Sequence, residues 1–492
     1  MRTLLLGVDI GTSSCKTALF DPEGKVVAQG GCEYPVAYPR KGWAEQDPAA
    51  WWNGVCRAVR EMTAKNGIDP TEIAGIGVDG QSWSVIALDA EGNVLCPTPI
   101  WTDTRSEEIC RVTSAVLTEE RIFGLCGNPV QPGYTWPKII WYREHRPEVF
   151  AKTEKILQSN SYIVYRMTGE ITQDLSQGYG LACFDMRKGC WDDGMCEALG
   201  IPRKILPEIV PCHQIVGKLT KEAAEQTGLT EGIPVAAGGL DAACGTLGAG
   251  VVSPGQTQEQ GGQAGGMSIC IDCYAADPRL ILGFHAVPGR WLLQGGTTGG
   301  GGALKWLRET ICPELSFAEM SSLAETAEPG SGGVAFLPYM AGERSPIWNP
   351  DACGVFFGLN FGTTRAQMIR ACMEGVAYAL RHNLETAETA GARADTLRAM
   401  GGSANSRIWT QIKADVTGHR IEVPGSDTAT TLGAAMLAGV GTGVWRNFEE
   451  AAGQTVRVNR TVEPDPAARE IYDMGYRIYR RLYEQLKDLM KG

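Results

Sequence analysis

The chain of 492 residues lacks an apolar run of transmembrane length, and it lacks the basic segment, apolar core and cleavage site of a secretory signal. We therefore expect a cytoplasmic protein without a membrane contact. Positive charge is also scarce, because 45 basic side chains oppose 56 acidic ones and leave a net charge of -11. This balance disfavours a nucleic acid as partner, so any anionic ligand must be bound by local geometry.

Metal-binding and cofactor-binding patterns are few. The 16 cysteines are scattered along a long chain, which favours reduced and mostly buried thiols over a disulfide scaffold. Cys270 and Cys273 form one CxxC pair, but no second pair or histidine cluster lies at zinc-ligand spacing, so we expect no metal there. Residues 75–80 match GxGxxG, yet residues 84–88 predict a strand where a dinucleotide site needs a helix.

The length predicts two large domains, because 492 residues exceed one ordinary hydrophobic core. PVAAGGLDAACGTLGAG at residues 234–250 repeats the theme of LLLGVDIGTSSCK at residues 4–16: an apolar strand, glycine, Asp and then small residues. We therefore predict an N-terminal domain over 1–233, a C-terminal domain over 234–463 and a closing helix over 464–492.

Helix starts are predicted at three places. Asp47 is a capping residue with Pro48 at the first helical position. Thr364 and Gln367 have the spacing of a capping box, and an apolar stripe follows them. A last amphipathic helix is predicted to open at Asp465.

The opening segment predicts a phosphate site. Its strand ends at Asp9, and the turn behind it contains Gly11, Thr12, Ser13 and Ser14. Such a turn presents backbone N–H groups to phosphate oxygens, while Asp9 can hold Mg²⁺ through water and Lys16 supplies positive charge. The alternative is an Asp that only accepts hydrogen bonds from its own turn.

The second glycine-flanked carboxylate, Asp241, lies where a strand meets a predicted helix, and its oxygens are expected to face a cleft between the two halves. A carboxylate there can accept the proton of a substrate hydroxyl as that oxygen attacks phosphorus. The alternative is a helix N-cap. The glycine pair Gly401 and Gly402 is a third glycine-rich feature, after those at Asp9 and Asp241. Three such features favour a functional site over a chance pattern.

Six segments together resemble the FGGY family of carbohydrate kinases over essentially the whole chain, and their residues are most similar to those of the xylulokinase subgroup. They are GVDIGTSSCKTALFD, GWAEQDPAAWW, IWTDTR, GGLDAACGTLGAG, the segment from FLPYMAGERSP to GVAYAL, and the segment from GGSANSRIW to GAAMLAG. The resemblance implies an α/β protein with two ribonuclease-H-like domains of the actin, hexokinase and Hsp70 superfamily and an interdomain active-site cleft.

The resemblance also implies a role for each matching position. Asp9 matches the magnesium-linked acid and Asp241 the catalytic base, which also contacts the substrate. The sugar is expected at Gln81, Ser82, Trp83, Trp101 and Asp103, with Arg105 in the same segment. The nucleotide is expected at Gly11, Thr12, Ser13, Ser14, Lys16, Gly261, Gly262, Gly301, Lys305, Gly402, Ser403 and Asn405.

Two departures from the family pattern concern the ligands. Ser82 and Trp83 stand where xylulokinases have Met-His, and an indole offers one donor and a large apolar face where a histidine offers two ring nitrogens. Trp83 could instead be a core tryptophan. EQGGQAGG at residues 259–266 stands where many relatives have a Gly-Thr-Ser hairpin whose threonine hydroxyl reaches the phosphates. Either backbone amides substitute for that hydroxyl or the phosphate site is built differently.

We therefore predict an ATP- and Mg²⁺-dependent kinase that phosphorylates a primary hydroxyl of a small sugar, with D-xylulose as the leading substrate. Another ketose or a polyol is the alternative. A protein that binds ATP and sugar without catalysis is a rival, kept by the altered hairpin. The oligomeric state stays open, a homodimer included.

Overall fold

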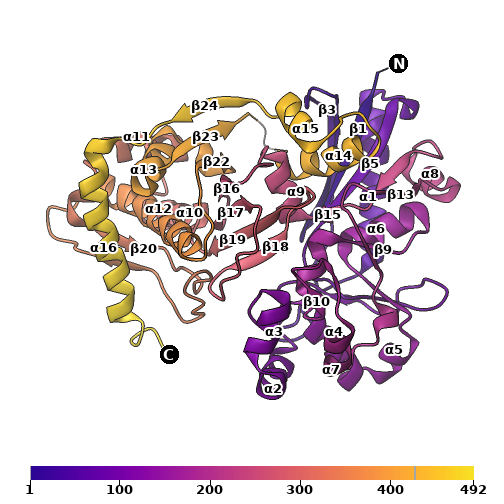
Figure 1. Ribbon diagram of the computed structural model, residues 1–492. Coiled ribbons are helices and arrows are strands. Elements are labelled where there is room, and N and C mark those ends of the chain that lie inside the picture. Colours follow the sequence, from indigo (N-terminus) through magenta and orange to yellow (C-terminus); the bar gives the residue numbers. More distant parts are fainter. Residues whose placement is uncertain (1, 426–427, 492) are drawn as a thin grey trace. The chain divides into compact units, whose positions relative to one another are not determined.

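The computed structural model describes residues 2–425 and 428–491, and the chain forms two compact units (Figure 1). Unit 1 comprises Met1–Val252, Leu282–Trp291 and Thr428–Val456, and unit 2 comprises Ser253–Ile281, Leu292–Asp427 and Arg457–Gly492. Two seven-stranded sheets with helices against them confirm the expected pair of α/β domains. The boundaries at residues 233 and 463 stay a prediction, whereas the compact units are discontinuous in sequence. Among the described residues, no helix is long and apolar enough to cross a membrane.

The first sheet has the strand order β13-β14-β5-β1-β2-β3, with β15 also paired to β5. Strand β1 is antiparallel to β2 and parallel to β5, which is parallel to β14 and β15. The bounds are β1 (Leu4–Ile10), β2 (Ser14–Phe20), β3 (Val26–Glu33), β5 (Ile73–Gly80), β13 (Ile215–Lys218), β14 (Pro234–Ala236) and β15 (Gly239–Leu240). Short strand pairs lie outside this sheet: β4 (Glu45–Gln46) with β7 (Thr98–Pro99), β6 (Ile86–Leu88) with β8 (Lys155–Leu157), β9 (Thr172–Asp174) with β12 (Glu208–Val210), and β10 (Phe184–Asp185) with β11 (Cys190–Trp191).

The helices of unit 1 come from both ends of the chain. Asp47 caps α1 as predicted, because its carboxylate accepts from Ala49 N. The helices are α1 (Pro48–Asn66), α2 (Glu107–Leu117), α3 (Glu119–Cys126), α4 (Thr135–His145), α5 (Pro147–Lys152), α6 (Ser159–Thr168), α7 (Asp193–Leu199), α8 (Lys221–Thr227), α9 (Asp241–Gly248), α14 (Ala429–Gly441) and α15 (Phe448–Thr455).

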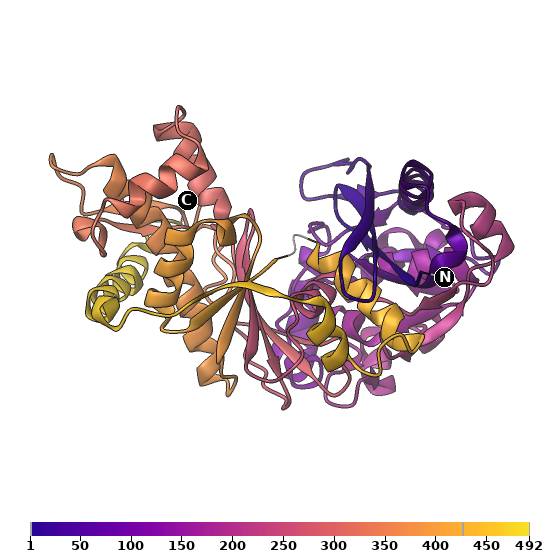
Figure 2. The same ribbon diagram turned by 90° about the horizontal axis from the view of Figure 1, so that it is seen from above.

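Helix α14 lies directly on the backbone of the first sheet, and Figure 2 shows it against the indigo strands. A Cβ atom on Gly7 of β1 would lie 1.9 Å from the carbonyl oxygen of Thr431, and one on Gly77 of β5 would lie 1.8 Å from that of Ala434. No side chain larger than hydrogen fits at either strand position. These two glycines therefore set the distance between the sheet and α14.

The second sheet has the order β18-β19-β17-β16-β22-β23-β24. Strand β16 is antiparallel to β17 and parallel to β22, which repeats the relation of β1 to β2 and β5. The bounds are β16 (Gln256–Gly261), β17 (Gly265–Ile271), β18 (Ile281–Phe284), β19 (Trp291–Thr297), β22 (Thr396–Met400), β23 (Arg420–Pro424) and β24 (Val458–Val462), besides the hairpin of β20 (Ala335–Leu337) and β21 (Val355–Phe357).

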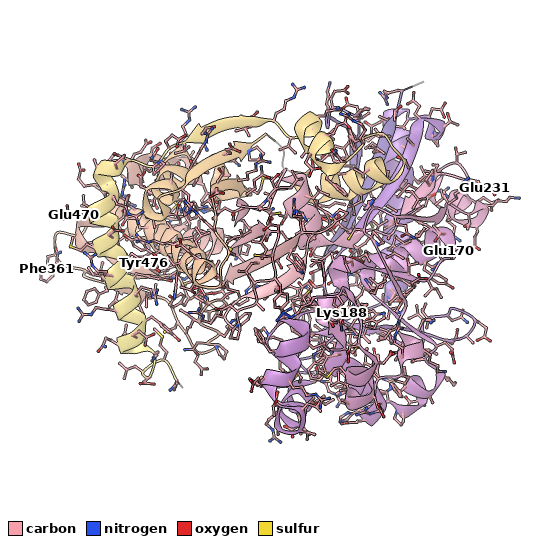
Figure 3. The ribbon with its side chains drawn as sticks, in the orientation of Figure 1. Glu170, Lys188, Glu231, Phe361, Glu470 and Tyr476 are labelled. Atoms are coloured by element: carbon pink, nitrogen blue, oxygen red, sulfur yellow. The ribbon has the colours of Figure 1, made fainter. Side chains whose placement is uncertain are left out.

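The helices of unit 2 are α10 (Gly301–Ile311), α11 (Phe317–Glu325), α12 (Arg365–Thr389), α13 (Arg407–Thr417) and α16 (Arg469–Leu486). The capping box of Thr364 and Gln367 at α12 is confirmed, and Asp465 caps a 3-10 turn that leads into α16. Tyr476 of α16, labelled in Figure 3, lies 6.0 Å from the Tyr378 ring of α12. The apolar stripe of α12 is therefore core, as predicted.

Candidate active site

A row of carboxylates begins where two parallel strands carry the same three residues. Gly-Val-Asp occurs at residues 7–9 of β1 and at 77–79 of β5, and the register pairs Asp9 with Asp79. Side chains at matched positions of neighbouring parallel strands point to the same face, so these two carboxyl groups lie side by side. Lys16 pairs with Asp9 from β2, and its Nζ is 3.8 Å from the Asp9 carboxylate.

Asp241 extends this row on the same unit. Gly239 of β15 pairs with Asp79, and Asp241 follows two residues later as the first residue of α9. The sequence-based boundary put Asp241 in the second domain, but parallel pairing of β15 with β5 gives it to unit 1 with Asp9. Its Oδ1 accepts a hydrogen bond from Ala242 N at 2.7 Å, and Leu240 holds the N-cap position instead.

Burial raises the pKa of all three carboxyl groups, and repulsion by neighbouring carboxylates adds to this at Asp79 and Asp241. Burial raises the pKa of Asp241 to about 7, and the negative charge of Asp9 adds to this. Burial also raises the pKa of Asp9, although the Lys16 ammonium opposes it, and holds the pKa of Asp79 well above its usual range. Asp241 can therefore exchange a proton near neutral pH, as a general base must.

The predicted phosphate turn between β1 and β2 has its carbonyl groups fixed from one side. Tyr34 Oη donates to the Gly11 carbonyl at 2.7 Å, and Gln46 Nε2 donates to that of Thr12 at 2.8 Å. In a planar trans peptide the next N–H points the opposite way, so the N–H groups of Thr12 and Ser13 point away from these partners. Their orientation suits an anion on that side of the turn.

The predicted sugar segment follows β5. Gln81 is anchored by its backbone N–H to Ile10 and by its Nε2 to Gln46, at 2.9 Å each. Trp83 has a φ of 58°, and its ring packs edge-on against Tyr134 and Tyr179 with centroids 4.6 and 5.6 Å away. Ser82, beside it, is half-buried.

Several buried polar atoms of this segment and its neighbours are not hydrogen-bonded to any described residue. Within residues 2–425 and 428–491, Gln81 Oε1, Trp83 Nε1 and Tyr134 Oη have no hydrogen-bond partner. A buried unpaired donor or acceptor costs the fold about 1–3 kcal/mol, so such a group normally meets a partner. The three atoms offer an acceptor and two donors, which sugar hydroxyls can satisfy.

The second predicted sugar segment contains Trp101, whose side chain is partly exposed, and Asp103, whose side chain is already hydrogen-bonded within the protein. Trp101 is 38% exposed and donates through Nε1 to Thr12 Oγ1 at 2.9 Å, so it joins the phosphate turn. Asp103 is fully buried, and its two oxygens accept from Ala44 N and from Arg105 at 2.7 to 3.1 Å. Asp103 therefore holds its segment in place through Arg105.

The residues predicted for the nucleotide in unit 2 come together around the β16–β17 hairpin. Gly301 N, at the start of α10, donates to the Gly262 carbonyl at 2.7 Å, and a Cβ on Gly401 would lie 3.0 Å from the Gly261 carbonyl group. Ser403 is buried and Asn405 exposed on the 3-10 turn Gly402–Asn405, while Lys305 lies on α10 with an exposed side chain.

Sequence reasoning missed three features of these sites. Asp79 was available in the repeated Gly-Val-Asp, but GVDG was examined only for its glycines. Lys138 is fully buried and donates to the carbonyl groups of Trp83, Ile100 and Gly133, which no local pattern signals. In unit 2, Lys413 forms a buried ion pair with Glu259 at 2.6 Å and also donates to Ser403 Oγ at 2.7 Å.

The repeated sheets, the hydroxyl-rich turn and the row of carboxylates are the parts of a phosphotransferase site. Comparisons with known proteins identify the family. The model for the N-terminal domain of the FGGY family of carbohydrate kinases matches residues 4–248, and that for the C-terminal domain matches residues 276–442.

Individual relatives match over their full length. The xylulose kinases of Bacillus subtilis and Escherichia coli are each 32% identical to this chain. The alignments cover 99% of this chain and 97% and 100% of the two relatives, respectively. The crystal structure of xylulose kinase from Rhodospirillum rubrum superposes with a TM-score of 0.93, at 31% identity over 99% of this chain and all of that one. The chain belongs to the FGGY family of carbohydrate kinases, which confirms the resemblance. It is an enzyme that transfers a phosphoryl group to a sugar hydroxyl.

Proposed function

We propose that this kinase uses ATP and Mg²⁺ to phosphorylate a primary hydroxyl of a ketopentose, with D-xylulose as its substrate. The names of the full-length relatives support this substrate. The observation that carries the chemistry is the strand pairing that brings Asp241 into one row with Asp9 and Lys16, where burial raises its pKa to about 7.

Asp241 acts as the general base. Its ionised carboxylate accepts the proton of the attacking hydroxyl as the O–P bond forms, and the Ala242 N–H bond holds the carboxylate in place. Phosphoryl transfer through a loose transition state needs mainly orientation and charge compensation. Lys16 and the N–H groups of Thr12 and Ser13 supply that compensation at the turn, beside Gly11 and Ser14.

The residues present fit a magnesium ion. The Asp9 carboxylate offers the hard oxygen ligands that Mg²⁺ prefers, and the carboxylates beside it make its surroundings negative. When bound, the ion supplies positive charge that compensates the phosphate oxygens. The rest of the nucleotide binds Gly261, Gly262, Gly301, Lys305, Gly402, Ser403 and Asn405.

The sugar binds at Gln81, Ser82, Trp83 and Trp101, with Asp103 as the buried support of Trp101. Gln81 Oε1, Trp83 Nε1 and Tyr134 Oη, the unpartnered atoms, are satisfied by its hydroxyl groups. Trp83 also covers the carbon skeleton with its apolar face. Its ring leaves no space near Gly180, where a Cβ would lie 2.1 Å from Trp83 Cδ1, so the indole is fixed in one position.

A coupled ADP-release assay over ketopentoses, ketohexoses, polyols and aldoses tests this function. We expect the highest kcat/KM for D-xylulose. A tenfold higher kcat/KM for another ketose or a polyol would show that this sugar, and not D-xylulose, is the substrate. ADP release that does not depend on any sugar would overturn the proposal. Trp83→His, with Trp306→His as a control on a partly exposed tryptophan of α10, should change the order of the sugars without changing the KM for ATP.

A further inference from the structure

Asp79 is a buried carboxyl group for which the proposed reaction has no step. It is fully buried, and within the described part of the chain no donor of a backbone amide or another side chain reaches either oxygen, so its one hydrogen-bonding neighbour is the carboxyl group of Asp9. An unpaired buried carboxyl group is costly, and the cost is larger when it is ionised. Asp79 therefore differs from a side chain that only fills the core.

Other buried carboxylates of this protein show how the fold normally treats such a group. Glu259 accepts one hydrogen bond and Asp415 accepts two, whereas four others each accept at least three from backbone N–H groups, hydroxyls, amides or guanidinium groups. These four residues are Asp103, Asp174, Glu343 and Glu374. The chain can thus supply donors to buried carboxylates, and it supplies none to Asp79.

The surroundings of Asp79 are negative. Asp9 lies beside it in the parallel register, and Asp241 lies close enough for its charge to act on the group. Lys16 is 3.8 Å from Asp9, but its side chain is 69% exposed and is screened by water. A row of carboxylates with one exposed ammonium requires further positive charge to be ionised together.

We propose that Asp79 is a second carboxylate ligand, beside Asp9, of the divalent cation that enters with the nucleotide phosphates; this rests on the proposed use of ATP and Mg²⁺. Carboxylates on adjacent strands stand about 4.8 Å apart at the backbone, within reach of one hydrated ion. Mg²⁺ commonly takes one or two carboxylates and completes its shell with water and phosphate oxygens. This agrees with the described residues, which hold no cluster of three or more metal-ligating side chains.

A sugar hydroxyl explains Asp79 less well. A hydroxyl donates one hydrogen bond, so it would satisfy one oxygen and leave the other unpaired. It would also leave the repulsion among the three carboxylates uncompensated. A divalent cation answers both features, because it binds the oxygens and neutralises the row.

Titration of the full-length protein with Mn²⁺ at saturating ADP, with free Mn²⁺ followed by electron paramagnetic resonance, tests the proposal. Asp79→Asn keeps the shape of the side chain and removes its charge. We expect at least about a tenfold loss of Mn²⁺ affinity, the lower end of what support of a metal site contributes. The thermal midpoint without metal should not fall, and the affinity for ADP without metal should stay unchanged.

Asp241→Asn is the matched control, because it removes a carboxylate from the same row outside the Asp9–Asp79 pair. It should retain Mn²⁺ affinity while turnover is lost. Unchanged Mn²⁺ binding in Asp79→Asn, or an equal loss in both variants, would overturn the proposal. Weaker sugar binding with unchanged Mn²⁺ binding would instead identify Asp79 as a sugar ligand and overturn it too. Mn²⁺ binding that depends on Asp79 in a protein that phosphorylates no ketopentose would refute the proposed substrate alone.

Discussion

Asp241→Asn should stabilise the protein at alkaline pH while it abolishes turnover. The pKa of Asp241 rises from 3.8 to about 7 on folding, and one pKa unit corresponds to about 1.4 kcal/mol, so ionised Asp241 costs the folded state at most about 4 kcal/mol. The side chain is partly exposed, so we expect roughly 2 kcal/mol of that to be realised. Asparagine removes this cost because it does not ionise.

The sign of this effect depends on pH. A carboxyl group with a raised folded pKa gives full stability below its unfolded pKa and loses it as pH rises through the folded value. The variant should therefore gain most in thermal midpoint at pH 8, less at pH 5.5, and lose at least about 100-fold in kcat. Asp193→Asn, at an 85% exposed side chain, is the control and should show no such trend. A variant less stable than the wild type at pH 8 would refute the reasoning.

Three further predictions concern the site and its support. The kcat/KM for the sugar should fall below about pH 7 as Asp241 takes up a proton, and a profile flat from pH 5.5 to 8 would contradict its role as base. Lys138→Met removes three hydrogen bonds to the segments that carry Trp83 and precede Trp101. The KM for the sugar should therefore rise at least about tenfold, while the KM for ATP stays unchanged. Equal changes in both KM values would argue against a local positioning role. Gly77→Ala should destabilise by about 1–3 kcal/mol in denaturant unfolding, because its Cβ would overlap the Ala434 carbonyl, while Gly124→Ala on α3, with open space, should not.

Local patterns predicted the elements whose causes are local. The capping residues Asp47 and Thr364 satisfy N–H groups two or three residues away, so the sequence alone could place those helix starts. The turn after Asp9 also follows from its neighbours, since glycine adopts turn conformations without steric cost and small hydroxyl side chains hydrogen-bond the local backbone. The family resemblance rested on such local segments.

The compact unit that contains Asp241 is decided by a non-local cause. Its own strand and helix were predicted, but which sheet receives the strand depends on pairing with β5, more than 150 residues earlier in the chain. Asp79 was overlooked for the same reason. Its importance comes from Asp9 on the neighbouring strand, not from residues next to it in sequence.

The sequence by itself determined the family, the two repeated α/β folds and the acidic and glycine-rich residues of the site, because short segments carry these in their spacing and residue types. Only the tertiary structure decided that three carboxylates share one row, that Lys138 joins three segments, and that α14 returns from residue 429 to lie on Gly7 and Gly77. Burial and charge repulsion act between groups that are near in space, and strand pairing sets that nearness across long stretches of chain.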